Sequence, residues 1–247
     1  MNEHTVQGSG EPLVLLHGGL SDSTSWGAQI PKLAETYQTF AFDRRGHGRS
    51  PDTDAPFDYD EMADETVTFL EEVVAGPAHL VGWSDGGIVS LLTSMKRPDL
   101  VRRQVLIGAN FHHEGMHPAF DLGDDPEAEA VAALKSLYQS VAANPDHWPV
   151  FYGKGVHLFR TAPELASDDL RDVTVPTLVL AGDDDCIVHS HTVDLFESIP
   201  DAQLAIVPGT SHMLQLEKAA LVNQLILDFL AETDPPATMF PMRRAAH

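Results

Sequence analysis

The stretch His79-Leu-Val-Gly-Trp-Ser-Asp-Gly-Gly-Ile88 joins an apolar run to a segment with helical spacing. Inside it, residues 82–86 match the pattern G-x-S-x-G. The pattern alone is weak evidence, but its place between an expected strand and an expected helix is typical of a serine held in a strained turn with its hydroxyl exposed. A Cβ at Gly82 or Gly86 would collide with the neighbouring strand or helix, so we expect both glycines to be required. The simpler alternative is an ordinary Ser-containing turn.

Strand-like and helix-like patterns alternate over most of the 247 residues. Short apolar runs predict strands at 13–17, 39–43, 79–83, 105–108, 177–181 and 204–207. Apolar residues at helical spacing predict helices at 26–37, 59–74, 88–96, 189–198 and 218–231. Strands that alternate with helices of this length predict a mostly parallel sheet with helices on both faces.

The segment 111–173 interrupts this alternation, because it has helical patterns, most clearly at 127–142, but no strand of its own. We expect it to form a small helical cap over the ligand crevice, inserted into a core made of 1–110 and 174–232. The alternative is a plain surface excursion. Residues 233–247 contain three prolines, and we expect a flexible C-terminal tail there.

A serine hydroxyl is a poor nucleophile unless a base takes its proton. His212 lies between the last expected strand and the last expected helix, which suits the base of a Ser-Asp-His order. Gly182-Asp-Asp-Asp185 ends the preceding strand and offers the acid that would orient the imidazole. Spacing alone does not separate the three aspartates of that turn. Its alternative interpretation is a solvated acidic turn.

An oxyanion needs two backbone N–H donors. One is expected from Asp85, directly after the serine, and the other from Gly19 in the loop after the first buried strand, with Leu20 as second choice. Glycine in that loop would let the backbone approach a substrate. The alternative is a simple tight turn.

Composition excludes several classes of function. The net charge is -22, from 37 acidic and 15 basic residues, which argues against binding to nucleic acid or to anionic membranes. No apolar run is long enough to span a bilayer, and residues 1–10 do not resemble a signal peptide, so we expect a cytoplasmic protein. The single cysteine, Cys186, excludes a disulfide within the chain and a cysteine-only zinc site. The acidic composition also suggests tolerance of high salt, against the simpler alternative of an acidic protein with no salt adaptation.

One stretch matches the sequence of a zinc-binding motif but not the helix that this motif requires. His113-Glu-Gly-Met-His117 matches H-E-x-x-H, but that motif needs a helix, and here a strand precedes it, Gly115 lies inside it and Pro118 follows it. We therefore expect a cap loop and no metal ligands. No phosphate-binding loop of the GKS or GKT type occurs, and no G-x-G-x-x-G follows a strand, so no nucleotide cofactor is expected.

With these motifs the chain resembles the α/β-hydrolase fold family from about residue 8 to 231. The matching pieces are Leu15-Leu-His-Gly-Gly19, Asp43-Arg-Arg-Gly-His-Gly-Arg-Ser50, the turn at Ser84, the aspartate turn and His212. The resemblance implies that Asp185 is the acid and that the loop from Asp43 to Ser50 is structural. It argues against haloalkane dehalogenases and epoxide hydrolases, which use aspartate at the position of Ser84. Family members begin with a two-stranded hairpin, but only residues 5–7 offer a strand here. We therefore expect about seven strands, with the family's first strand missing and an exposed or dimerising edge.

A narrower similarity is to the valacyclovirase group, the biphenyl hydrolase-like hydrolases of α-amino-acid esters. It rests on residues 82–88 and on Ile107-Gly-Ala-Asn110. In that group the aspartate after the nucleophile helps to bind the substrate's ammonium group, which implies substrate-binding roles for Asp85 and, beside it, Trp83. The alternative is that Asp85 only caps the helix that begins there.

Together these features predict a cofactor-free serine hydrolase that cleaves small carboxylic esters, including α-amino-acid esters, through Ser84, His212 and Asp185 and an acyl-enzyme. Other reactions on the same triad remain open: lactone hydrolysis, carbon–carbon bond hydrolysis and perhydrolysis. A ligand receptor that retains the triad is an alternative from a different class. The expected partner is a small-molecule ester, without nucleic acid or membrane, and the protein is expected to be a monomer or a homodimer.

Overall fold

The computed structural model describes residues 3–232, 238–240 and 242. Most of the expected flexible tail over 233–247 lies outside these described residues. In the described part of the chain, every helix falls short of the length and apolarity that crossing a bilayer requires.

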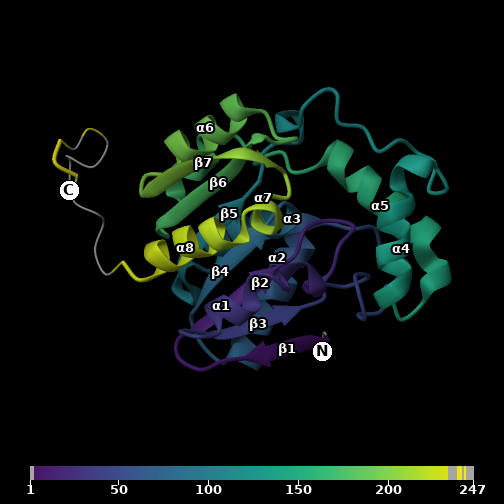
Figure 1. The fold of residues 1–247 in the computed structure, drawn as a ribbon, viewed down its shortest axis with the longest axis horizontal. Helices are drawn as coiled ribbons and strands as arrows, with labels where there is room; N and C mark the ends of the chain where they lie inside the picture. The colour runs from purple at the N-terminus through teal and green to yellow at the C-terminus, as the bar shows by residue number, and fades with distance from the viewer. Residues whose placement is uncertain (1–2, 233–237, 241, 243–247) are drawn as a thin grey trace.

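The described residues form a seven-stranded sheet in the order β1-β3-β2-β4-β5-β6-β7 (Figure 1). The strands are β1 (His4–Gln7), β2 (Pro12–Leu16), β3 (Gln38–Phe42), β4 (Ala78–Trp83), β5 (Val101–Ile107), β6 (Thr177–Asp184) and β7 (Ala202–Ser211). Strand β1 runs antiparallel to β3 at one edge, and all other neighbours are parallel. The predicted α/β-hydrolase architecture, with a mostly parallel seven-stranded sheet, is confirmed.

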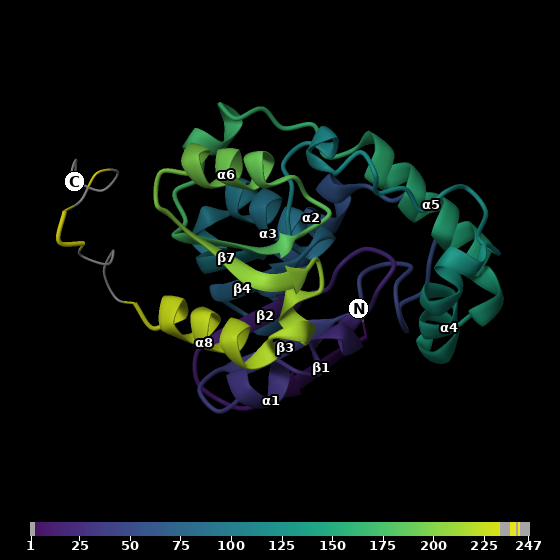
Figure 2. The ribbon, with the colours of Figure 1, turned by 45° about the horizontal axis from the view of Figure 1, so that its top comes forward.

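Helices cover both faces of the sheet (Figure 2). The α-helices are α1 (Ile30–Leu33), α2 (Tyr59–Phe69), α3 (Asp85–Lys96), α4 (Ala132–Val141), α5 (Trp148–Thr161), α6 (His189–Ser198), α7 (Leu214–Glu217) and α8 (Ala219–Leu230). The remaining helical turns, 3₁₀ except for the π-helical η2, are η1 (Ser23–Trp26), η2 (Leu70–Val74), η3 (Pro98–Leu100), η4 (His113–Gly115), η5 (Glu129–Val131), η6 (Pro145–His147) and η7 (Asp169–Asp172).

Alternation along β2 shows why both faces are apolar. Val14 and Leu16 belong to the core that includes α2 and α3, whereas Leu13 and Leu15 belong to the core that includes α1 and α8. Successive side chains of a strand point to opposite faces, so a strand covered on both sides is apolar throughout. The sheet is therefore a buried platform, and the loops at the carboxyl ends of its strands are available for a site.

One predicted helix is wrong. The expected helix at 26–37 is reduced to η1 and the single turn of α1, because Gly27 ends η1 and Pro31 lies at the start of α1. Proline fits the first turn of a helix but cannot donate a hydrogen bond to the turn before it, so the two pieces do not fuse.

Helices α4 and α5 lie together to one side of the sheet (Figures 1 and 2). They come from the segment between β5 and β6, and α5 was not predicted from the sequence. Its start is buried through Trp148, Phe151 and Tyr152, which extend the core on the α2 and α3 side. Pro149 and the two glycines inside α5 conceal the helix in the sequence. Helix α5 packs closely on Leu20 at Gly155, where a Cβ would lie 2.7 Å from Cδ2 of Leu20 and would displace that side chain.

Candidate active site

Ser84 is held in a strained turn between β4 and α3. Its φ of 54° and ψ of −121° lie in a region that non-glycine residues rarely adopt. The turn is fixed at both ends: the N–H of Ser84 donates to the carbonyl of Ile107 at 2.8 Å, and its own carbonyl accepts from Gly87 at 2.8 Å. Strain maintained in this way is typical of functional positions, because it aims a side chain.

The two glycines of the motif are needed for the reason expected from the sequence. A Cβ at Gly82 would lie 2.1 Å from the carbonyl oxygen of Gly86, and one at Gly86 would lie 1.9 Å from the carbonyl oxygen of Leu16. No side chain fits at either distance, so strand β4, helix α3 and strand β2 can approach only where glycine stands.

His212 follows β7 and is paired with Asp185, which follows β6. Nδ1 of His212 donates to Oδ1 of Asp185 at 2.7 Å, and the Asp185 side chain is fully buried. The backbone N–H groups of Ile187 and Gly182 also donate to this carboxylate. Burial alone would raise the pKa of Asp185, but these hydrogen bonds lower it below its ordinary value, so the group is held as a carboxylate.

The other two aspartates of the turn do not meet the imidazole. Asp183 accepts from the backbone N–H of Thr210 at 3.0 Å, and Asp184 is exposed. The structure therefore separates three carboxylates that spacing alone could not distinguish.

Burial lowers the pKa of His212, but the hydrogen bond to Asp185 and the nearby Cys186 outweigh burial and raise it above its ordinary value. Removing the Asp185 charge would lower the pKa of His212, because the carboxylate favours the imidazolium. Such a pairing suits a base that must hold a proton during a reaction.

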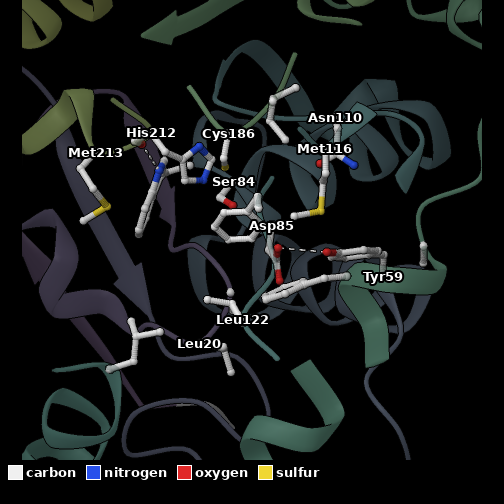
Figure 3. A pocket seen from close by; sticks show the side chains of 17 residues that line it. Leu20, Tyr59, Ser84, Asp85, Asn110, Met116, Leu122, Cys186, His212 and Met213 are labelled. Atoms are coloured by element: carbon white, nitrogen blue, oxygen red, sulfur yellow. Dashed lines mark hydrogen bonds between the residues drawn. The ribbon is translucent and has the colours of Figure 1, made fainter. Parts of the chain in front are cut away.

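Ser84 and His212 both line a cavity of about 200 Å³. In Figure 3 the Ser84 hydroxyl and the His212 imidazole are directed into the same space. The walls are mostly apolar, and six residues from 111–173 contribute to them: Met116, Phe120, Leu122, Leu134, Phe159 and Ala162. Among the described residues that line this cavity, none is Lys or Arg.

The residues expected to supply oxyanion N–H groups lie at the same cavity. Gly19, Leu20 and Asp85 all line it. Asp85 is the first residue of α3, where a backbone N–H has no partner within the helix. A Cβ at Gly19 would lie 2.4 Å from Oδ2 of Asp85 and 2.5 Å from the Phe159 ring, so any larger residue would push these two side chains aside.

The side chain of Asp85 is buried at the cavity wall and accepts a hydrogen bond from the hydroxyl of Tyr59 at 2.9 Å (Figure 3). Burial raises the pKa of Asp85, and the charge of buried Arg44 and the Tyr59 hydrogen bond offset this only in part. Burial also raises the pKa of Tyr59, which stays a donor. A carboxylate in this setting gains from a cation, because its own solvation is poor.

Tyr59 was not singled out from the sequence as a site residue. It opens α2, 26 residues before its partner, and nothing in the local pattern separates it from an ordinary apolar position on that helix. Asn110 and Cys186 also line the cavity and were not chosen in advance.

Trp83 makes contacts beside the cavity that the sequence did not predict. Its indole N–H donates to the backbone carbonyl of His212 at 2.9 Å. Its ring packs against Gly18, so a Cβ on Gly18 would lie 2.8 Å from the ring. The ring lines the cavity but also fixes the loop that bears the imidazole.

The resemblance-based expectation for Asp43 agrees with its surroundings. Its buried carboxylate accepts from the N–H of Ser23 at 2.9 Å and from the N–H and Nε of Arg49 at 3.0 Å. It is not among the residues that line the cavity. These bonds hold the loop that follows β3, and they lower the pKa of Asp43 against the effect of burial.

The H-E-x-x-H letters do not form a helix that presents both histidines. Residues His113–Gly115 make one turn of 3₁₀ helix, and Met116 then pairs with Ile187 in an isolated bridge. His117 is fixed by its backbone, which donates to the carbonyl of Cys186 at 2.6 Å. The segment is a loop beside the cavity, in line with the sequence-based expectation.

Known proteins resemble this chain over nearly its whole length. A family model described as "Alpha/beta hydrolase family" matches residues 13–225. "Putative carbamate hydrolase RutD" of Azorhizobium caulinodans is 29% identical, over 94% of this chain and 95% of its own. "Serine hydrolase BPHL" of the mouse is 30% identical, over 90% of this chain and 80% of its own. The crystal structure of the enol-lactonase from Burkholderia xenovorans superposes with a TM-score of 0.77 at 18% identity, over 93% of this chain and 96% of its own, a likeness of fold alone.

Proposed function

We propose a function on one premise: the chain belongs to the alpha/beta hydrolase family, whose model matches most of its length, and it is a hydrolase. We propose that it is a serine hydrolase of small carboxylic esters that needs no cofactor. One observation carries the proposal: Ser84, strained at a φ of 54°, shares a cavity with His212, whose Nδ1 is 2.7 Å from Asp185.

The reaction follows from the roles of these three groups. Ser84 Oγ attacks the ester carbonyl carbon while Nε2 of His212 takes the hydroxyl proton. The carbonyl oxygen becomes an oxyanion held by the backbone N–H groups of Asp85 and Gly19, with Leu20 as the alternative second donor. The intermediate collapses, His212 gives its proton to the leaving alcohol, and an acyl-Ser84 ester remains. Water then attacks that ester by the same route and releases the acid, while Asp185 stabilises each imidazolium.

The charge of the site selects the class of substrate. The described lining of the cavity offers a buried carboxylate at Asp85 and no Lys or Arg, and the whole chain carries a net charge of -22. A carboxylate substrate would find no cationic partner there, whereas a substrate ammonium would meet Asp85. The proposal is therefore that esters of apolar α-amino acids are preferred over anionic esters.

The segment 111–173 is proposed to act as a cap. Six of its residues form apolar wall of the cavity, and α4 and α5 lie over one side of the core. A cap in this place would set the size of the acyl or alkyl group that the site accepts.

A second candidate is hydrolysis of a carbamate, supported by the printed name of the Azorhizobium relative. The same triad would attack a carbamate carbonyl, and a neutral carbamate fits the absence of Lys and Arg from the described lining. Hydrolysis of a lactone by the same three residues is a further alternative. Carbon–carbon bond hydrolysis of an anionic substrate is disfavoured by the same lining.

The test compares initial rates on the p-nitrophenyl esters of valine and of its des-amino analogue, with wild type, Ser84→Ala and Asp85→Asn. The expected result is that Ser84→Ala lowers kcat/KM for both esters by roughly 10⁴-fold or more. Asp85→Asn should lower the preference for the amino ester over its analogue by roughly 10-fold to 100-fold, the range of a charged hydrogen bond. A wild type that turns over neither ester but is strongly stabilised by one would favour the receptor alternative.

A further inference from the structure

A possible metal-ligand group lies at the cavity, because the only cysteine of the chain, Cys186, follows directly after Asp185. Sγ of Cys186, a ring nitrogen of His212 and a carboxylate oxygen of Asp185 all lie within 4.8 Å of one another. Among the described residues, this is the one group of three or more His, Cys, Asp or Glu side chains whose ligand atoms come so close. Cys186 also lines the cavity (Figure 3), and the proposed hydrolysis gives it no part.

We propose that Cys186, His212 and Asp185 form a binding site for Zn²⁺, and that Zn²⁺ bound there switches the hydrolase off. Thiolate, imidazole and carboxylate are the three ligand types that zinc takes in proteins, at about 2.3 Å, 2.0–2.1 Å and 2.0–2.2 Å. Those bond lengths in a tetrahedron place neighbouring ligand atoms roughly 3.3–3.6 Å apart. The observed separations of up to 4.8 Å would have to shorten to this range by rotation of the side chains.

The protons balance without any other reactant. Zn²⁺ displaces the thiol proton of Cys186 to solvent, and where His212 is protonated its second ring proton also leaves to solvent, so that the imidazole binds in its neutral form. Asp185 is already held as a carboxylate by three hydrogen-bond donors. Three protein ligands leave a fourth position, which solvent would fill.

Inhibition follows from either ring nitrogen of His212. If Nδ1 binds the metal, the hydrogen bond to Asp185 is lost. If Nε2 binds it, the lone pair that would accept the Ser84 proton is occupied. Inhibition thus rests on the proposed hydrolysis, but binding of Zn²⁺ does not.

The binding test uses Co²⁺, which takes zinc sites and has a thiolate-to-metal absorption band in the near ultraviolet. Because the chain has one cysteine, such a band reports Cys186 alone. Wild type, Cys186→Ala, Ser84→Ala and His117→Ala are titrated with Co²⁺ and then with Zn²⁺. The expected result is a band that saturates at one equivalent, persists in Ser84→Ala and His117→Ala, is abolished in Cys186→Ala, and is removed by one equivalent of Zn²⁺.

The activity test measures Zn²⁺ inhibition of ester hydrolysis, with each variant compared to its own rate without metal. Cys186→Ala should need at least 10 times more Zn²⁺ for half inhibition than wild type, whereas His117→Ala should match wild type. Absence of the band in folded wild type, or equal Zn²⁺ inhibition of wild type and Cys186→Ala, would overturn the site. A band in a protein that hydrolyses no ester would support the metal site and contradict the proposed function, so the two failures are distinguishable.

Discussion

At Ser84 the backbone itself is part of the site. Left-handed or related backbone in a non-glycine residue costs about 1–3 kcal/mol, and here it is maintained by hydrogen bonds to Ile107 and Gly87. Gly82 and Gly86 allow the strands and the helix to approach closely enough to impose it. One residue is thus strained so that its hydroxyl can face the cavity.

Gly108 is expected to position the imidazole. It has a φ of 57°, and a Cβ there would lie 2.9 Å from Nδ1 and Cε1 of His212. Gly108→Ala should lower kcat for ester hydrolysis at least about 10-fold while KM changes little, because a displaced base slows the chemical step more than binding.

Gly123→Ala is the matched control for that variant, because Gly123 also has a positive φ, 71°, but nothing lies within 4 Å of its Cβ position. It introduces backbone strain without touching His212. Equal loss of kcat in the two variants would show that strain, and not contact with the imidazole, is responsible.

The Asp185 charge is expected to set the pH dependence. The reaction needs neutral His212, so a raised pKa of His212 moves the acid limb of the kcat/KM profile to higher pH. Asp185→Asn should lower the pKa of His212 and shift this limb to lower pH, with kcat reduced roughly 10⁴-fold, as in other triads that lose their carboxylate. A profile whose acid limb stays in place would contradict the assignment of Asp185.

At the scale of elements, the pieces that build the site could largely be predicted, and their contacts could not. Residues 82–86, the aspartate turn and His212 each stand at the end of a predicted strand, and parallel strands bring such ends together. Tyr59 has no local signal of this kind, since its part depends on which side of helix α2 meets the cavity. Helix α5 was missed because Pro149, Gly153 and Gly155 weaken the helical pattern of the sequence. The helix itself is stabilised by burial of Trp148 and Phe151 in the core.

Helix α5 is tied to the core through Asp52. Oδ2 of Asp52 accepts from Nζ of Lys154 at 2.7 Å and from Nε2 of His147 at 3.0 Å. The other carboxylate oxygen, Oδ1, accepts from Arg45 at 3.1 Å. The Asp52 side chain is only 6% exposed. Its loss would take this acceptor from Nε2 of His147 and remove one acceptor each from Lys154 and Arg45, which also donate to backbone carbonyls. Asp52→Ala should reduce the free energy of unfolding in urea by roughly 1–3 kcal/mol. Asp52→Asn, which retains acceptor capacity, should lose less, and a change in Asp52→Ala below about 0.5 kcal/mol would contradict this role.

At the scale of the whole molecule, the excess of acidic residues is the dominant feature. A net charge of -22 destabilises the compact state through repulsion at low ionic strength, and salt screens this repulsion. We expect the melting temperature and kcat/KM for a neutral ester to hold or rise between about 0.05 M and about 2 M NaCl. A clear fall in both across that range would contradict adaptation of this surface to salt.

The central claim is that Ser84 is the nucleophile, and covalent trapping tests it most directly. Wild type and Ser84→Ala are treated with diethyl p-nitrophenyl phosphate, and the intact mass, the labelled peptide and the released nitrophenolate are measured. The account predicts one label per wild-type chain, located on Ser84, with one equivalent of nitrophenolate and loss of ester hydrolysis, and no label on Ser84→Ala. A label on another residue, or ester hydrolysis that persists in Ser84→Ala, would contradict it.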